Sequence, residues 1–351
     1  MNILVLATAA TEGGALTILN NLYEDVKSKD SLDTWFFAVS YSDLKDSENI
    51  KILRYQEAKK SWFKRLYFDK FTLDKIVKEN DIDLVLSLQN TLAKSNKPKQ
   101  VLYMHQPLPF VDRRYSIFED RKFWLYQNVI YKFIKKSLKK ADYIIVQSEW
   151  MRDAIFKRVD RPEGSVKVSH PQLDITKLVK NNLDYTNKFF YPSGLYSYKN
   201  HKLILDALIG IDNKYSVSFT LDSDSPYTQE LKSISDKENL SVNYLGSISY
   251  DEVCERYSRS TLIFASEIET FGLPLLEARL SNSIVLALNA PFSKEILAGY
   301  KNAYFFDNAD ELRVLIKKVL NKEIVNHLVD DENILNSNSL YDEIEIYKKT
   351  I

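Results

Sequence analysis

The chain has 351 residues and a mass of 40.9 kDa, which exceeds one ordinary hydrophobic core, so two domains are expected. Hydrophobic residues make up 45% and charged residues 27%, a balance that excludes a disordered chain. The 48 Lys and Arg residues equal the 48 Asp and Glu residues, and this neutrality argues against a protein that binds nucleic acid over its whole surface.

The single cysteine, Cys254, excludes an intramolecular disulfide and a cysteine-based zinc site, and it fits a reducing compartment. The four histidines show no metal-ligand spacing, and no apolar run approaches the roughly 18–20 residues of a membrane span. The apolar residues 2–10 lack a preceding basic segment. They therefore predict a buried strand rather than a secretory signal.

Short, almost continuous apolar runs in the first half predict parallel strands that are buried on both faces. These runs are Ile3–Ala7, Trp35–Val39, Leu84–Leu88, Val101–Met104 and Tyr143–Val146. Residues 15–27, between the first two runs, place Leu19 and Leu22 on one helical face. This alternation predicts right-handed crossovers and a doubly wound sheet.

The second half repeats the pattern and predicts a second domain of the same kind. Its expected strands are Phe189–Tyr191, Val217–Leu221, Val242–Leu245, Leu262–Ala265 and Ile284–Leu288. Its expected helices are His201–Leu208, Tyr250–Arg259 and Asp310–Leu320. The predicted fold class is therefore α/β, with two Rossmann-like doubly wound domains and a ligand-binding cleft between them.

The domain bounds follow from composition. Residues 175–187 are polar, rich in asparagine and only weakly periodic, so we expect the linker there. The first domain then comprises residues 1–174 and the second comprises residues 188–335.

The segment 266–278, SEIETFGLPLLEA, carries the sharpest chemical signal. Gly272 permits a close approach to a ligand, Pro274 suits the first turn of a helix, and the amides of residues 271–273 then favour a phosphate. Glu269 and Glu277 flank this position, and carboxylates accept hydrogen bonds from vicinal sugar hydroxyls. The alternative is a helix whose acidic residues complement its dipole.

This segment resembles the E-x7-E motif of the family 4 glycosyltransferases, in the form E-x-F-G-x-P-x-x-E. Both glutamates, Phe271, Gly272 and Pro274 fall in register. The resemblance spans most of residues 1–320, with its motifs concentrated between 190 and 300. It implies a GT-B fold of two Rossmann-like domains, a nucleotide-sugar donor, retention of anomeric configuration, and no metal or other cofactor.

The resemblance also implies roles for individual residues. Glu277 would bind the ribose hydroxyls, and Glu269 with the backbone of residues 271–273 would hold the donor sugar and phosphate. The segment 191–201, YPSGLYSYKNH, is similar to a family segment whose Lys contacts the donor diphosphate, so Lys199 would neutralise the leaving group. The family's common Arg is Gly194 here, so one cation is missing or comes from elsewhere.

Two further elements lie in the first half. The pair Gly13-Gly14 resembles the family's Gly-Gly loop near the donor phosphates, although a tight turn also explains it. His105 ends the strand 101–104 and is expected to contact donor or acceptor; a buried structural histidine is the alternative. The expected catalytic residues are His105, Lys199 and Glu269. The expected donor-binding residues are Gly13, Gly14, Lys199, Asn200, Glu269, Thr270, Phe271, Gly272, Leu273 and Glu277.

The sequence Asp222-Ser223-Asp224 follows an expected strand and is typical of metal–nucleotide binding in another transferase fold. Its place in the second domain, ahead of the E-x7-E segment, favours a polar turn instead.

Two basic stretches rich in aromatic residues, 59–70 and 121–140, predict contact with an anionic membrane surface. The alternative is a core-facing helix with a solvated basic face. Residues 1–170 carry a net charge of +7 and residues 171–351 a net charge of −7, as expected for an acceptor domain that faces such a membrane.

The combined prediction is a retaining, metal-independent glycosyltransferase at the inner face of the cytoplasmic membrane. The first domain would bind a saccharide acceptor linked to polyprenyl, and the second a nucleotide sugar. The C-terminal residues 336–351 would form a helix that crosses back to the first domain, as the resemblance implies. We expect a role in surface polysaccharide synthesis, such as lipopolysaccharide O-antigen. The alternatives are a soluble sugar synthase or epimerase of the same fold, or a non-catalytic subunit.

Overall fold

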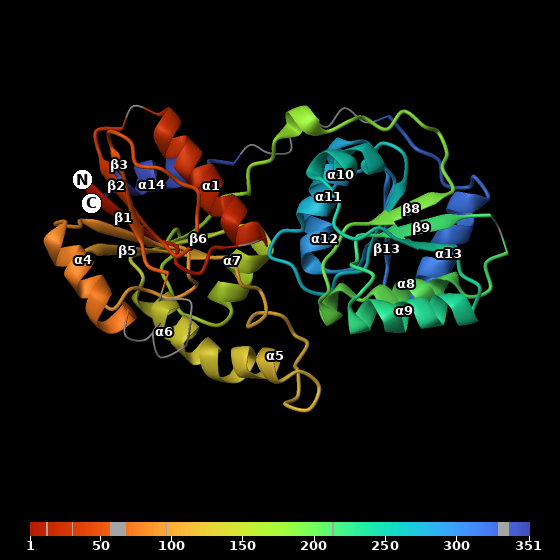
Figure 1. The fold of residues 1–351 in the computed structure, drawn as a ribbon, viewed down its shortest axis with the longest axis horizontal. Coiled ribbons are helices and arrows are strands. Elements are labelled where there is room, and N and C mark those ends of the chain that lie inside the picture. The colour runs from red at the N-terminus through yellow and green to blue at the C-terminus, as the bar shows by residue number, and fades with distance from the viewer. Residues whose placement is uncertain (12, 30, 57–67, 96, 213, 329–336) are drawn as a thin grey trace. The chain divides into compact units, whose positions relative to one another are not determined.

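The computed structural model describes residues 1–351 except 12, 30, 57–67, 96, 213 and 329–336. Its chain divides into two compact units (Figure 1). Unit 1 comprises Met1–Gln172 and Ser337–Ile351, and unit 2 comprises Leu173–Asn336. Each unit contains one parallel sheet with helices on both faces, so the expected fold class is confirmed.

The sheet of unit 1 has seven strands in the order β3-β2-β1-β4-β5-β6-β7. They are β1 (Asn2–Leu6), β2 (Thr34–Val39), β3 (Ile50–Arg54), β4 (Leu84–Ser87), β5 (Lys99–Met104), β6 (Tyr143–Val146) and β7 (Val166–Val168). The strand order reverses between β1 and β4, and the carboxyl ends beside such a reversal are the usual ligand position. The edge strands β3 and β7 match no predicted strand, because Lys51 and Lys167 interrupt their short apolar runs.

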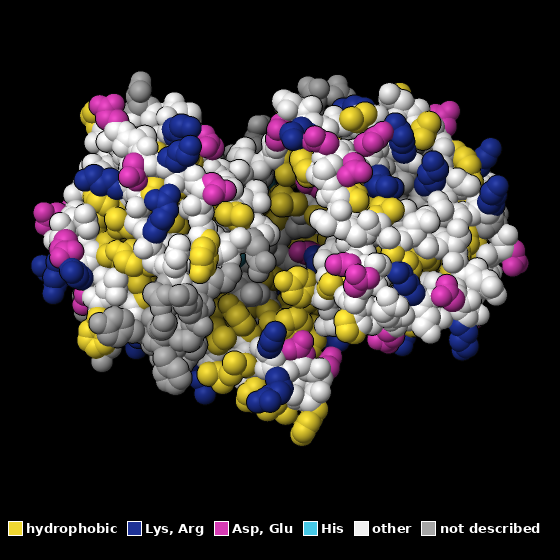
Figure 2. Space-filling model, viewed as in Figure 1, with side chains coloured by type: hydrophobic (Ala, Val, Ile, Leu, Met, Phe, Trp, Pro, Cys, Tyr) yellow, Lys and Arg dark blue, Asp and Glu magenta, His cyan; other side chains and the backbone are white. Residues whose placement is uncertain are grey.

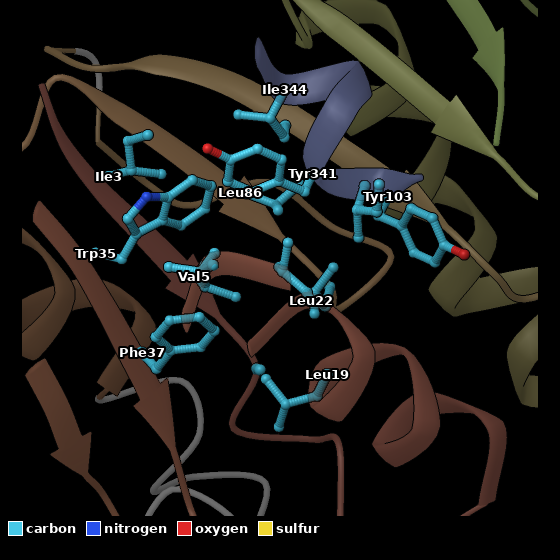
Figure 3. Packing of buried hydrophobic residues seen from close by; sticks show 14 of the residues in the cluster. Ile3, Val5, Leu19, Leu22, Trp35, Phe37, Leu86, Tyr103, Tyr341 and Ile344 are labelled. Carbon is cyan, nitrogen blue, oxygen red and sulfur yellow. The ribbon is translucent and has the colours of Figure 1, made fainter. Parts of the chain in front are cut away.

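Helices cover both faces of this sheet. They are α1 (Gly13–Ser28), α4 (Leu73–Glu79), α5 (Arg121–Leu125), α6 (Tyr131–Lys140), α7 (Glu149–Phe156) and α14 (Leu340–Lys348), with π-helical turns η1 (Phe68–Thr72) and η2 (Tyr126–Ile130). Leu19 and Leu22 of α1 pack with Ile344 of α14 on the face that carries Val5 (Figure 3). The opposite face packs against α4, α6 and α7.

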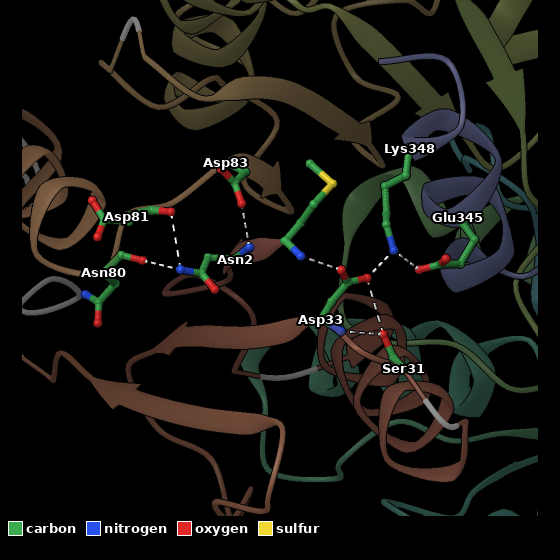
Figure 4. A network of polar contacts seen from close by, with 9 residues as sticks. Asn2, Ser31, Asp33, Asn80, Asp81, Asp83, Glu345 and Lys348 are labelled. Carbon is green, nitrogen blue, oxygen red and sulfur yellow. Dashed lines mark hydrogen bonds and ion pairs between the residues drawn. The ribbon is translucent and has the colours of Figure 1, made fainter.

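Polar contacts join the ends of the chain within unit 1 (Figure 4). The Met1 amine lies 2.7 Å from Oδ1 of Asp33, and the other Asp33 oxygen forms an ion pair with Lys348 of α14. Lys348 also contacts Glu345 at 2.7 Å. Burial alone would raise the pKa of Asp33, but hydrogen bonds and charges from Lys348 and the Met1 amine outweigh it and lower that pKa.

Unit 2 contains six parallel strands in the order β10-β9-β8-β11-β12-β13. They are β8 (Lys188–Tyr191), β9 (Ser216–Phe219), β10 (Val242–Tyr244), β11 (Thr261–Phe264), β12 (Val285–Leu288) and β13 (Ala303–Phe306). The order reverses between β8 and β11, so the loops after these two strands meet at one edge of the sheet.

The helices of unit 2 lie in two groups (Figure 1). They are α8 (His201–Leu208), α9 (Pro226–Lys237), α10 (Tyr250–Tyr257), α11 (Leu273–Leu280), α12 (Pro291–Ile296) and α13 (Ala309–Leu320), with 3-10 turns η3 (Ile175–Lys177) and η4 (Ser197–Lys199). Helix α8 packs beside both α9 and α13, and α11 packs beside both α10 and α12. Helix α9 matches no predicted helix because it buries only Thr228, Leu231 and Ser235.

The segment expected to be a linker, residues 175–187, belongs to unit 2. Its Asn181 is buried, and the Asn181 N–H donates to the carbonyl of Ser281 at 2.6 Å. Asn282 donates in return to the carbonyl of Asn181 at 3.2 Å. Asn282 has the left-handed conformation expected after a helix, with a φ of 59°.

Candidate active site

The loop between β11 and α11 has a backbone that only glycine readily adopts. Gly272 stands at the N-cap of α11 with φ 96° and ψ 58°. A Cβ at this position would lie 3.1 Å from Cδ1 of Leu275 and 3.6 Å from Cδ2 of Phe292. Pro274 occupies the first turn, and no side chain caps this helix end. Its backbone N–H groups therefore offer a favourable position for an anion.

Lys199 and Glu269 form an ion pair beside this helix end. Lys199 ends η4 on the loop after β8, and Glu269 lies on the loop after β11, so the neighbouring strands bring them together. The side chains are 15% and 19% exposed. A charge pair that remains partly accessible can exchange its partners when a charged ligand arrives.

Backbone and side-chain contacts connect the same two loops. The Glu267 N–H donates to the carbonyl of Tyr198 at 2.8 Å, and Asn200 donates to Oε1 of Glu267 at 3.2 Å. Asn200 itself adopts the left-handed conformation, with φ 58°. The expected donor residues Lys199, Asn200 and Glu269 thus occupy one connected group.

Two buried residues, Tyr191 and His201, form hydrogen bonds at the loop that carries Lys199. The hydroxyl of Tyr191 donates to the carbonyl of Lys199 at 2.8 Å, and Ser193 Oγ lies 2.7 Å from Nε2 of His201. Burial, reinforced by the charge of Lys199, lowers the pKa of His201 to about 3, so its imidazole is neutral at physiological pH. Neither Tyr191 nor His201 is a predicted site residue, although both flank the Lys-Asn segment.

Glu277 is 6% exposed on α11, and both of its carboxylate oxygens accept hydrogen bonds from tyrosines. The Tyr250 hydroxyl donates to Oε1 at 3.1 Å, and the Tyr257 hydroxyl donates to Oε2 at 2.9 Å. Burial raises the pKa of Glu277, while the two hydrogen bonds oppose the rise. Neither tyrosine is predicted as a site residue, because no local pattern connects α10 to α11.

In unit 1, a polar cluster lies where the strand order reverses. The His105 N–H, after β5, donates to Oδ1 of Asn90 at 2.9 Å. Gln89, after β4, donates to the hydroxyl of Thr8, after β1, at 2.8 Å. Burial lowers the pKa of His105 to about 4, so its ring is uncharged at neutral pH. Nε2 of the ring lies 3.4 Å from Nδ2 of Asn90, and Nδ1 is buried without a hydrogen-bond partner among the described residues. Contact of His105 with donor or acceptor stays a prediction.

Gly13 and Gly14 begin α1 and are exposed, and Gly13 has a φ of 59°. A Cβ at either position would meet no atom within 4 Å, which leaves open space above both residues. These glycines and His105 belong to unit 1, whereas the other expected site residues belong to unit 2.

Asp222 and Asp224 lie in the exposed turn after β9, where the Asp224 N–H donates to Oδ1 of Asp222 at 3.1 Å. Across the described part of the chain, no three His, Cys, Asp or Glu side chains are grouped to hold a metal ion.

Two parallel α/β units, each with a polar site at its strand-order reversal, define the GT-B architecture of nucleotide-sugar-dependent glycosyltransferases. Two family profiles match consecutive parts of the chain: glycosyltransferase family 4 matches residues 28–177, and glycosyl transferases group 1 matches residues 176–334. The chain belongs to this glycosyltransferase family, as the E-x7-E resemblance implies.

A curated relative is the O-antigen chain mannosyltransferase RfbU of Salmonella typhimurium. It is 22% identical over 228 residues, which cover 63% of this chain. The match spans 64% of the relative's own length.

Several solved structures share the fold. The Anabaena protein HepE in complex with UDP and glucose superposes with a TM-score of 0.68 at 16% identity, over 100% of both chains. Sucrose-phosphate synthase from Thermosynechococcus elongatus superposes with a TM-score of 0.71 at 15% identity, over 99% of this chain and 98% of that one. The lipopolysaccharide outer core galactosyltransferase WaaB superposes with a TM-score of 0.66 at 17% identity, over 99% of this chain and 100% of that one.

Proposed function

We propose that the protein transfers a sugar, with retention of configuration, from a nucleotide-sugar donor bound in unit 2 to a saccharide acceptor bound in unit 1. The observation that carries this proposal is the Lys199–Glu269 ion pair beside the uncapped end of α11. A cation, a carboxylate and a helix N-terminus without a side-chain cap provide complementary groups for a sugar diphosphate.

Donor binding separates this ion pair. Lys199 turns to the diphosphate, and Glu269 accepts hydrogen bonds from the hydroxyls of the donor sugar. Lys199 and the α11 amides stabilise the negative charge that develops on the leaving diphosphate, so no metal is needed. The acceptor hydroxyl attacks the face from which the diphosphate leaves, and a phosphate oxygen takes its proton. Glu277 binds the ribose hydroxyls beside Tyr250 and Tyr257.

Substitution of the ion pair tests this assignment. We expect Lys199→Ala and Glu269→Ala each to lower kcat by at least about 100-fold, as loss of a group that stabilises transition-state charge does. Transfer is measured with the donor that raises the Tm in a thermal-shift screen of nucleotide sugars. Lys237→Ala, which removes an exposed ion pair with Glu238 at the end of α9 in the same unit, is the control. Wild-type turnover in both site variants refutes the assignment.

The acceptor class is inferred from the relatives. RfbU is named as an O-antigen mannosyltransferase and WaaB as a lipopolysaccharide galactosyltransferase. We therefore propose a lipid-linked saccharide acceptor in surface polysaccharide synthesis. Such an acceptor lies at the membrane, so the enzyme would work at the inner face of the cytoplasmic membrane.

The helical segment 121–140 supports this location. Leu125, Val129 and Phe133 succeed one another at intervals of four residues and are 44%, 38% and 59% exposed. Exposed cations flank them: Arg121, Lys122, Lys132, Lys136, Lys139 and Lys140. Hydrophobic and basic side chains gather over α5 in the space-filling view (Figure 2). Apolar side chains among cations on a solvent face fit an anionic lipid surface.

The second basic stretch, 59–70, lies outside the described residues at positions 59–67. No helix among the described residues is both long and apolar enough to span a membrane. The proposed membrane contact therefore rests on the surface of α5, η2 and α6.

A further inference from the structure

A groove of about 650 Å³ opens in unit 1 between α1 and the loop that follows β2. Its walls include Asn20, Glu24 and Lys27 from α1 and Tyr41, Asp43 and Lys45 from the loop. The groove begins at the carboxyl ends of β1 and β2, the edge of an open α/β sheet at which ligands bind. None of the donor-site residues described above lines it.

The loop wall is held in place by several contacts. The Tyr23 hydroxyl donates to the carbonyl of Lys45 at 2.9 Å, and Leu44 is buried in the core of unit 1. Oδ1 of Asp46 accepts from the N–H of Ile52 on β3 at 2.7 Å. The groove is therefore formed before any ligand binds, which lowers the entropic cost of binding.

The charges on the walls cancel. The negative charges of Glu24 and Asp43 balance the positive charges of Lys27 and Lys45. Oε2 of Glu24 lies 3.9 Å from Nζ of Lys27. A balanced surface does not favour an anion such as a nucleotide diphosphate. It offers carboxylate, ammonium and amide groups, which together bind the hydroxyls of a neutral ligand.

An aromatic side chain completes the lining. Tyr41 lines the groove and is 48% exposed, and a tyrosine ring has flat apolar faces. Ser42 also lines the groove, and its hydroxyl is buried without a hydrogen-bond partner among the described residues. An aromatic surface surrounded by hydrogen-bonding groups matches a sugar ring, which has an apolar face and a rim of hydroxyls.

We propose that this groove binds the neutral saccharide portion of the acceptor, with the ring of Tyr41 against a sugar face and Asp43 accepting from sugar hydroxyls. This inference rests on the proposed function, because it supplies the acceptor site that a glycosyltransferase needs in addition to its donor site. The groove selects the acceptor by its sugars, whereas the surface of α5, η2 and α6 contacts the lipid.

Binding of neutral oligosaccharides tests the groove directly. The full-length protein is titrated with trisaccharides of mannose, galactose and glucose, with binding followed by saturation-transfer NMR. We expect at least one to bind the wild type, and Tyr41→Ala and Asp43→Asn each to weaken that binding about tenfold or more. Tyr41→Phe keeps the ring, and Glu48→Gln changes an exposed carboxylate on the same loop outside the groove. Both are expected to bind as the wild type does.

Three results would overturn the inference: no trisaccharide binds the wild type, Tyr41→Ala binds as well as the wild type, or Glu48→Gln loses as much affinity as Asp43→Asn. Thermal shift with nucleotide sugars, measured on the same variants, tests the donor site separately from the groove. Variants of the groove should still bind the nucleotide sugar. Failure of the wild type to bind any nucleotide sugar would contradict the donor site but would leave the trisaccharide binding at the groove unaffected.

Discussion

At the scale of single residues, Glu277 combines burial with the capacity to bind a ligand. Glu277 is 6% exposed, and its carboxylate accepts hydrogen bonds from two tyrosine hydroxyls. Neutral donors therefore stabilise its negative charge. A buried carboxylate in such surroundings costs folding free energy, because desolvation penalises its charged form. A ribose that adds hydroxyl donors would compensate part of this cost.

The pH dependence of stability reports this cost. Burial raises the pKa of Glu277 above its ordinary 4.5, so the folded protein holds that proton more tightly than the unfolded chain does. The Glu277 side chain therefore makes the wild type lose stability as the pH rises from 4.5 through its folded-state pKa, and Glu277→Gln lacks this contribution. We expect the Tm of Glu277→Gln, relative to wild type, to increase over this range and then to level off.

The measurement is the Tm of both proteins across a pH series from acid to neutral. Glu255→Gln, which changes an exposed glutamate on α10, serves as the control and should follow the wild type. A Tm difference between wild type and Glu277→Gln that stays constant over the whole series would contradict the assigned cause.

At the scale of secondary-structure elements, the segment 121–140 is the clearest case of a pattern with two interpretations. It forms α5, η2 and α6 in succession, and its inner side buries Gln127, Ile134 and Leu138. The core therefore uses only part of its apolar residues. Leu125, Val129 and Phe133 remain exposed, which favours the membrane surface over a simple core-facing helix.

Sedimentation with vesicles tests this surface. We expect the wild type to co-sediment with vesicles that contain phosphatidylglycerol and to stay in solution with phosphatidylcholine alone. The double variant Leu125→Ser/Phe133→Ser should bind about tenfold more weakly, because it removes two apolar side chains that would enter the lipid.

The control for this experiment is Phe305→Ser, which replaces a similarly exposed aromatic residue in unit 2 and should bind as the wild type does. Equal recovery of the wild type in the supernatant with and without anionic lipid would contradict the proposed membrane contact.

At the scale of the whole molecule, neutrality conceals a division of charge along the chain. Residues 1–170 carry 29 Lys and Arg against 22 Asp and Glu, and the remainder carries 19 against 26. The end of the chain returns to the basic half, where α14 packs into the core of unit 1. Unit 1 is thus completed by residues from both ends of the sequence.

The ion pair between Lys348 and Asp33 should contribute measurably to the stability of unit 1. We expect Lys348→Ala to lower the free energy of unfolding by about 1–3 kcal/mol, because it leaves a largely buried carboxylate without this partner. The pKa of Asp33 is lowered in the folded protein, so this contribution is present above pH 3.8 and is lost as the pH falls through the folded-state pKa.

Urea unfolding at neutral and acid pH provides the measurement. The loss caused by Lys348→Ala should shrink at acid pH, and Lys349→Ala, at an exposed neighbouring position, should cost little at either pH. Equal losses for the two variants would show that the contact with Asp33 is not the cause.

Local patterns in the sequence are sufficient for much of the architecture. Central strands such as β1 and β4 are predictable because a parallel strand covered on both faces must be apolar along its length. The left-handed Gly272 and the helix-starting Pro274 follow from their own backbone preferences. The edge strands β3 and β7 are missed because one face of each is open to solvent, so charged residues interrupt the pattern.

Partnerships between distant residues depend on the tertiary structure. Lys199 meets Glu269 only because β8 and β11 are neighbours, and Glu277 meets Tyr257 only because α10 packs beside α11. The groove beside Tyr41 likewise requires α1 and the loop after β2 to lie together. Backbone preferences and burial act on each short segment by itself. Contacts between segments depend on the order in which the strands join the sheet, and the pattern within any one segment does not carry that information.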